Sequence, residues 1–307
     1  MISLRATRPE DIPALSSLFA QRFGHPLSAE EWAWKYRQLP GESRSLVAVE
    51  TSGRVLAHAG ALRLPARWRG GEAGIWQLVD FAGSADRRGL RPALVELGRL
   101  LLADLPGDGD VPLIFGFPSE RHFRLGQRVF DYHPLATVEP LGGALPGAPA
   151  PAAARIEAGD FCAAWAEAAW ERCAPLGVRR STAFLNWRYH SRPGRYYRVY
   201  RLPGGGGEGL AVFAFVGDEA WAAELWLPPA GEWYPSMLAV AVDLRGAGLR
   251  TWRFWPPYGP HSGLLASLGL QPAGESRFVG CRGRAGGPDP SAAADGFYFA
   301  MGDYDLV

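Results

Sequence analysis

A basic turn with one glycine follows an apolar stretch of the chain, and its sequence is Asp86-Arg87-Arg88-Gly89-Leu90-Arg91. Residues 75–82 before the turn are typical of a β-strand, and residues 92–105 after it are typical of a helix. Backbone N–H groups at the start of a helix are unpaired and the helix dipole is positive there, so such a turn attracts anions. Three arginines add full positive charges, and the combination suits a diphosphate. The alternative is a solvated basic turn without a ligand, because short glycine motifs also arise by chance.

The elements that would position this turn alternate between strands and helices along the first half of the chain. Thr7 and Ser28 are each followed three residues later by a glutamate, which is the spacing of a helix capping box. We expect the order β-α-α-β-β-β-α-β-α-β, with the strand at 75–82 leading directly into the arginine turn. The second half has a similar succession of strands and helices. The sequence therefore predicts an α/β fold (α+β mixed sheet).

Landmarks of the first half recur in the second half at a constant offset. Trp34-Lys35-Tyr36 and Pro40-Gly41 are matched by Trp187-Arg188-Tyr189 and Pro193-Gly194, in the same order. Several matched landmarks in one order indicate an internal duplication. A stretch rich in proline, alanine and glycine separates the two copies and predicts an extended spacer. We therefore expect a first domain at 1–141, a linker at 142–155 and a second domain at 156–307.

The element order and the arginine turn resemble the GNAT superfamily of acyl-CoA N-acyltransferases. Members commonly carry a Gln/Arg-x-x-Gly-x-Gly/Ala loop between the fourth strand and the third helix, and Arg88-Gly89-Leu90 with Ala93-Leu94 matches that segment. Asp86 and Arg91 depart from the usual residues of this loop. The segment from Phe115 to Gly126 also resembles the fifth strand and fourth helix of the family. The resemblance covers most of the first half and implies two tandem GNAT-like domains, each a twisted mixed sheet flanked by helices.

The resemblance implies a site for acetyl-CoA or another acyl-CoA in the first domain. The expected coenzyme-binding residues are Phe81, Ala82, Gly83, Arg87, Arg88, Gly89, Leu90 and Arg91. GNAT proteins often use an acidic residue on the fourth strand as a general base, and Asp80 lies there between apolar neighbours. We expect partial burial to raise the pKa of Asp80; the alternative is an ion pair with a nearby arginine.

A general acid for the leaving thiolate is often a tyrosine on the fourth GNAT helix, but this chain has His122 in that region. His122 is therefore the expected acid, and the alternative is a surface histidine without a catalytic role. We expect Trp76 and Arg188 to contact the acceptor. Arg188 lies in a Leu-x-Trp-Arg-Tyr segment similar to one in tandem GNAT-like bacterial proteins, and it holds either a substrate anion or a local partner within the fold.

The second domain lacks a basic turn at the corresponding place. After its third strand the sequence is Pro228-Pro229-Ala230-Gly231-Glu232. Prolines have no N–H donor and the Glu232 carboxylate repels a diphosphate. We therefore expect the second domain to keep the fold without a coenzyme site.

The composition restricts the class of protein. The chain has 307 residues, a formal net charge of +1 and 48% hydrophobic residues, which is typical of a globular protein. Neutral charge argues against a nucleic-acid partner, no apolar run is long enough to span a membrane, and the histidines show no metal-ligand spacing. Cys162, Cys173 and Cys281 are too widely spaced for a disulfide framework, so we expect a cytoplasmic protein.

The expected function is transfer of an acyl group, most simply acetyl, from coenzyme A to a primary amine of a small molecule or peptide. One alternative is an aminoacyl transferase of the tandem GNAT-like type that builds peptidoglycan cross-bridges. Another is a non-catalytic tandem protein that senses a ligand or scaffolds a complex. The sequence names neither the acceptor nor the oligomeric state.

Overall fold

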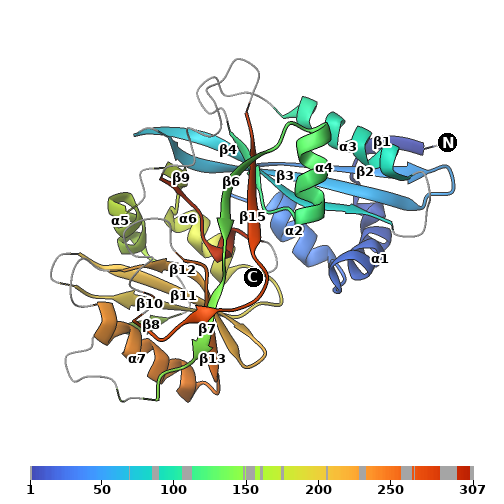
Figure 1. The fold of residues 1–307 in the computed structure, drawn as a ribbon. Helices are drawn as coiled ribbons and strands as arrows, with labels where there is room; N and C mark the ends of the chain where they lie inside the picture. The colour runs from blue at the N-terminus through green and yellow to red at the C-terminus, as the bar shows by residue number, and fades with distance from the viewer. Residues whose placement is uncertain are drawn as a thin grey trace. The chain divides into compact units, whose positions relative to one another are not determined.

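The computed structural model describes residues 2–68, 70–84, 90–105, 113–147, 149, 156–159, 162–173, 176–204, 207–227, 233–256, 265, 267–283 and 296–304. The chain forms two compact units. The first unit comprises Met1–Ala66, Glu72–Leu135 and Phe278–Ala293, and the second comprises Arg67–Gly71, Ala136–Arg277 and Ala294–Val307. Each unit is a mixed sheet with helices packed against it (Figure 1).

The elements up to residue 138 follow the expected order of the first half. They are β1 (Ile2–Ala6), η1 (Pro9–Asp11), α1 (Ile12–Phe23), α2 (Ala29–Arg37), β2 (Glu42–Glu50), β3 (Val55–Trp68), β4 (Gly71–Gly83), α3 (Leu90–Asp104), β5 (Ile114–Gly116), α4 (Glu120–Val129) and β6 (His133–Val138). The Ser28 cap of α2 is confirmed, because the Ser28 Oγ accepts a hydrogen bond from the Glu31 N–H at 2.9 Å. The Thr7 cap is wrong, because the N-cap residue of η1 is Arg8.

The elements after residue 138 form the whole second sheet and contribute three further strands to the first sheet. They are β7 (Leu141–Ala144), β8 (Glu157–Gly159), α5 (Ala164–Cys173), β9 (Leu176–Val178), α6 (Thr182–Leu185), the π-helical turn η2 (Asn186–His190), β10 (Tyr197–Leu202), β11 (Gly209–Val216), β12 (Glu219–Trp226), α7 (Trp233–Gly246), β13 (Thr251–Phe254), β14 (Gln271–Pro272), β15 (Arg277–Arg282), β16 (Phe297–Tyr298) and the 3₁₀ turn η4 (Met301–Asp303).

The two sheets have the same strand pattern, as the internal duplication predicts. The main path of the first runs β1-β2-β3-β4-β5-β15-β6, and the second runs β8-β10-β11-β12-β13-β7-β14. The first sheet has two further strands, β9 and β16, which pair with each other off this path. In both sheets the fourth and fifth strands are parallel, β4 with β5 and β12 with β13. The pairs at the start of each sheet are antiparallel.

The sixth position of each sheet is filled by a strand from the other half of the sequence. β15, near the C-terminal end, pairs antiparallel with β5 through Gly280↔Gly116, Cys281↔Phe115 and Arg282↔Ile114. β7, from the middle of the chain, pairs antiparallel with β13 through Leu141↔Phe254 to Ala144↔Thr251. In Figure 1, β15 is the orange-red strand beside green β6, and β7 is the green strand beside β13.

This exchange differs from the expected domain boundaries. Residues 142–144 were expected to begin an extended linker between the domains, but they form most of β7. The strand at Arg277–Arg282 was expected in the second domain, but it completes the first sheet. Glycine and alanine have weak strand propensity, so the sequence of β7 did not predict a strand. The segment forms one because it pairs with backbone groups at the edge of β13 that would otherwise be unpaired.

Side chains of β3 alternate between the two faces of the first sheet. Ala57, Ala59 and Ala61 pack in a core with Leu97 and Leu101 of α3. The residues between them, including His58 and Gly60, face Tyr36 of α2. Helices α2 and α3 therefore cover opposite faces of the sheet, as period-two alternation requires.

Candidate functional site

Strand β4 contains a residue in an unusual backbone conformation. Asp80 has φ of +54°, in the left-handed region that non-glycine residues rarely adopt. One such residue in a strand shifts the alternation of side chains by one position. Leu78 and Phe81 consequently both pack with the α3 core, and Asp80 points to α2. A strained residue in a central strand is typical of a functional site.

The carboxylate of Asp80 is buried and fully engaged. Lys35 Nζ lies 3.0 Å from both Oδ1 and Oδ2, and the Tyr36 hydroxyl donates to Oδ2 at 2.6 Å. The side chains of Lys35 and Asp80 are only 4% and 6% exposed. Burial of two opposite charges in contact requires such direct pairing, because either charge alone is costly away from water.

The expectation of a raised pKa for Asp80 is wrong. Burial does raise the pKa of this carboxyl, but the charge of Lys35 and the hydrogen bonds from Tyr36 and Lys35 outweigh it and hold the pKa below its usual value. Asp80 is therefore ionised at neutral pH and a weak base, with both oxygens already bonded. Asp80 does form an ion pair, as the alternative expected, but its partner is Lys35 and not an arginine.

His58 supports the strained residue from β3. Its Nδ1 lies 2.9 Å from the Asp80 carbonyl oxygen, and its Nε2 lies 2.9 Å from Ser45 Oγ. A carbonyl oxygen can only accept, so Nδ1 carries the proton and donates it, and Nε2 accepts from the Ser45 hydroxyl. Burial lowers the pKa of the His58 imidazole and keeps the ring neutral. The sequence prediction did not include Lys35, Tyr36 or His58; the repeated Trp-Lys/Arg-Tyr landmark was the signal that pointed to two of them.

Strands β4 and β5 part next to Asp80. Their parallel ladder runs from Trp76↔Ile114 to Leu78↔Gly116. β5 ends there, whereas β4 continues to Gly83. Residues 79–83 of β4 thus extend past the end of β5, and the chain enters α3 at Leu90.

The expected coenzyme residues are only partly described. Phe81, Ala82 and Gly83 form the end of β4, and Ala82 is buried. Leu90 and Arg91 form the first residues of α3. Arg87, Arg88 and Gly89 lie outside the described residues, and so do the side chains of Leu90 and Arg91.

His122 lies on the opposite face of β4 from the Asp80 carboxylate. Its ring contacts Phe81 edge to face, with centroids 6.4 Å apart, and Phe81 also contacts Phe130. The two expected catalytic residues are therefore not brought together. Burial, followed by the positive charges of Arg22 and Arg121, lowers the pKa of His122. The imidazolium that an acid would need is consequently disfavoured at neutral pH.

The two residues that we expected to contact the acceptor are both buried and make their contacts within the fold. Trp76 is 3% exposed and packs in the core with α3. Arg188, in the second unit, is 3% exposed and donates to the carbonyl oxygens of Gly302 at 2.5 Å and Tyr304 at 3.0 Å. The local-partner alternative for Arg188 is therefore correct. Cys162 and Cys281 are both buried free thiols.

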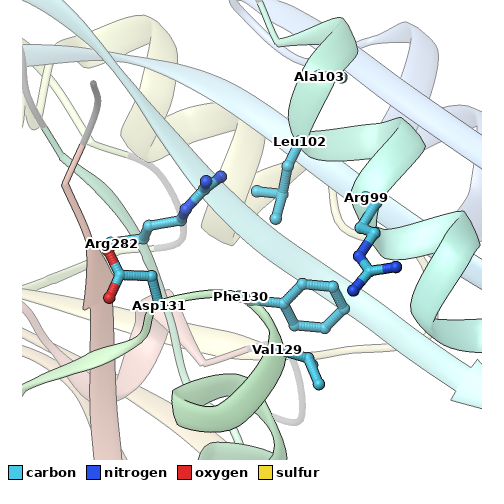
Figure 2. Close-up of a pocket in the computed structure, with 7 residues that line it drawn as sticks. All are labelled: Arg99, Leu102, Ala103, Val129, Phe130, Asp131 and Arg282. Atoms are coloured by element: carbon cyan, nitrogen blue, oxygen red, sulfur yellow. The ribbon is translucent and has the colours of Figure 1, made fainter.

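A pocket of about 330 Å³ lies elsewhere in the first unit, between α3, the end of α4 and β15 (Figure 2). Its lining residues are Arg99, Leu102, Ala103, Val129, Phe130, Asp131 and Arg282. None of the expected site residues lines it, although Phe130 also contacts Phe81.

The second unit repeats the tyrosine–carboxylate contact of the first. Tyr189, the counterpart of Tyr36, donates to Glu224 Oε1 at 2.8 Å. Glu224 lies on β12, the counterpart of β4, and β12 bulges beside it: Val212 pairs with Glu224 and Phe213 with Ala222. The duplication therefore extends to the buried contacts at the centre of each sheet.

Among the described residues, no cluster of three or more His, Cys, Asp or Glu side chains is arranged to hold a metal ion. No helix in the described ranges is long and apolar enough to cross a bilayer.

Neither a protein-family model nor a curated protein sequence matches the chain. Solved structures do match. A GCN5-related N-acetyltransferase from Sphaerobacter thermophilus superposes with a TM-score of 0.59 at 18% identity, covering 94% of this chain and 97% of its own. A probable N-acyltransferase from Enterococcus faecalis gives 0.64 at 12% identity, covering 92% and 72%. A tandem GNAT protein from the clavulanic acid biosynthesis pathway gives 0.62 at 13% identity, covering 94% and 100%. At these identities the similarity concerns the fold, and the chain has the tandem fold of the GNAT superfamily.

Proposed function

We propose that this chain is an N-acyltransferase that binds acyl-CoA in its first unit. The observation that carries the proposal is the parting of β4 and β5 after Leu78↔Gly116, directly before the chain enters α3. Two parallel strands that part leave backbone donors and acceptors of β4 available to an extended ligand. The similarity to N-acetyltransferase structures supports the same conclusion.

The coenzyme would lie along residues 81–83 of β4, with its diphosphate on the turn Arg87–Arg91. Helix α3 begins at Leu90, so its N-terminal N–H groups and dipole favour an anion next to that turn. The arginines supply the full positive charge. The cofactor would be acetyl-CoA or another acyl-CoA, acting as co-substrate.

The transfer step needs few protein groups. The nitrogen of an acceptor amine attacks the thioester carbonyl carbon, the C–S bond breaks and the electron pair leaves with sulfur, while the extra proton on nitrogen passes to solvent. A thiolate is a tolerable leaving group, so no protonated His122 is required. In this scheme Asp80 is a positioning residue, because its contacts with Lys35, Tyr36 and His58 hold the strained strand in place.

Calorimetric titration with acetyl-CoA tests the coenzyme site. We expect saturable binding that Arg88→Glu abolishes, because the substitution replaces attraction for the diphosphate with repulsion. Arg128→Glu, at an exposed position near the end of α4, is the matched control and should bind as the unaltered chain does. Absence of binding at millimolar acetyl-CoA contradicts the proposal, and unchanged binding by Arg88→Glu contradicts the placement of the diphosphate.

Turnover is measured separately, by release of free thiol from acetyl-CoA in the presence of a panel of primary amines. We expect an amine-dependent rate with at least one small-molecule or peptide acceptor. Binding without release across the panel would instead favour the ligand-sensing alternative.

A further inference from the structure

The last described residues of the chain, Phe297–Tyr304, run through the interior of the second unit. β16 pairs in parallel with β9 through Phe297↔Leu176 and Tyr298↔Gly177. The backbones approach so closely that a Cβ on Gly177 would lie 2.6 Å from the Tyr298 carbonyl oxygen. Phe297, Phe299 and Met301 are buried. This segment, which we call the C-terminal segment, is therefore part of the core.

The C-terminal segment is bonded to the late part of β12. The Tyr298 hydroxyl donates to Glu224 Oε2 at 2.7 Å and accepts from Trp226 Nε1 at 2.7 Å. Gly302 lies against the β12 backbone, since a Cβ there would be 2.9 Å from the Ala223 carbonyl oxygen. Only a residue without a side chain fits this position.

Two buried arginines also bind the segment. Arg180 donates to Glu224 Oε1 at 2.8 Å and to Asp303 Oδ2 at 2.6 Å, and all three side chains are at most 2% exposed. Arg188 donates to the carbonyl oxygens of Gly302 and Tyr304. Removing the segment would take the Asp303 partner from Arg180 and two acceptors from Arg188, a large cost for buried charges.

The segment crosses the place where β12 and β13 part. Their parallel ladder runs from Glu219↔Thr251 to Trp221↔Arg253, and β12 continues to Trp226. The ring of Trp255, which follows β13, lies 5.6 Å from that of Tyr304. The segment thus contacts β12 and the residue that follows β13, beyond the last pair of the two strands. In the first unit, the corresponding place is the one proposed for the coenzyme.

We propose that the C-terminal segment is a permanent internal ligand of the second unit, occupying the opening between β12 and β13, so that the chain binds one acyl-CoA and binds it in the first unit. The number of coenzyme molecules bound per chain rests on the proposed function. The position of the C-terminal segment between β12 and β13 does not. The two parts are therefore tested by different measurements.

Native mass spectrometry of the intact chain with acetyl-CoA counts the sites. We expect one coenzyme per chain, and none bound to Arg88→Glu. Two coenzymes per chain would overturn the single-site inference, whereas one coenzyme retained by Arg88→Glu would contradict the placement of the diphosphate. A chain that binds none contradicts the proposed function and leaves the occupancy to be decided by the second measurement.

Amide hydrogen exchange of residues 297–304 in the unliganded chain is that second measurement. A permanent internal ligand should exchange about 100-fold or more slowly than an unstructured peptide, close to the protection of β12. Exchange at the rate of a free tail overturns the inference, whatever the coenzyme does.

Gly302→Ala provides a variant for the same measurement, because its Cβ would overlap the Tyr189 hydroxyl and press on Ala223. We expect exchange of residues 297–304 to rise about tenfold or more, with β2 and β3 of the first unit still protected to show that the chain is folded. Gly246→Ala is the matched control, since nothing lies within 4 Å of a Cβ at that position. Unchanged exchange in Gly302→Ala would contradict the close seating of the segment.

Discussion

At the scale of single residues, the centre of each unit is a buried carboxylate on the fourth strand of its sheet. Asp80 is bonded by Lys35 and Tyr36, and Glu224 is bonded by Tyr189, Tyr298 and Arg180. The equivalent tyrosine is kept in both units. The cation differs: Lys35 pairs directly with its carboxylate, whereas Arg188 holds the C-terminal segment.

The first prediction concerns the Lys35–Asp80 pair. Lys35→Met should destabilise the protein by about 3–5 kcal/mol, because it leaves the Asp80 charge buried without its cation. Asp80→Asn keeps a residue that tolerates the left-handed conformation and removes the charge. The double variant should be more stable than the sum of the two single effects implies, with a coupling on the order of 2 kcal/mol. Urea unfolding of the four proteins measures the cycle.

Arg124→Met is the control for that cycle. Arg124 pairs with Glu120 on the surface of α4, where the two side chains are 71% and 58% exposed. Its loss should change stability by no more than about 0.5 kcal/mol. A Lys35→Met effect as small as that of Arg124→Met would refute the account of the buried pair.

At the scale of elements, strand β4 and helix α3 determine the geometry of the proposed coenzyme site. The left-handed Asp80 sends Phe81 to the α3 face, and α3 approaches Phe81 closely at Gly98. A Cβ on Gly98 would lie 2.5 Å from Phe130 Cζ and 3.1 Å from Phe81 Cζ. A glycine inside a helix is unfavourable by itself, so packing explains its presence here.

The second prediction follows from that approach. Gly98→Ala should destabilise the protein by about 1–3 kcal/mol through overpacking, although helix propensity alone would stabilise it by about 1 kcal/mol. Thermal unfolding measures the difference. Gly246→Ala, at the end of α7 with open space around it, should be neutral or slightly stabilising. If both variants are stabilised alike, α3 is not closely packed against Phe130 and Phe81 at Gly98.

At the scale of the whole molecule, the two halves of the sequence exchange a strand. Each sheet is completed by a strand from the other half of the sequence, β15 in the first and β7 in the second. A strand lost from the interior of a sheet exposes unpaired backbone groups on two neighbours. Neither half of the sequence therefore contains a complete sheet.

The third prediction is that the halves fold only together. A fragment of residues 1–147 lacks β15, and a fragment of residues 148–307 lacks β7, so each alone should be insoluble or unfolded by circular dichroism. Coexpressed, they should copurify as one complex, because each supplies the strand that the other needs. A soluble, cooperatively unfolding fragment 1–141 would contradict the exchange and restore the simple domain boundary.

The sequence by itself determined the order of helices and strands up to residue 138, the duplication and the GNAT-like order, because periodicity and capping are local properties. The Ser28 cap and the repeated Trp-Lys/Arg-Tyr landmark were readable without coordinates. Only the tertiary structure decided the pKa direction of Asp80, since its partners Lys35 and Tyr36 lie 45 and 44 residues away in the chain. It also decided that β7 pairs with β13 and that β15 pairs with β5. Strand pairing depends on backbone groups that are alike in every residue, so side-chain pattern carries little information about the partner.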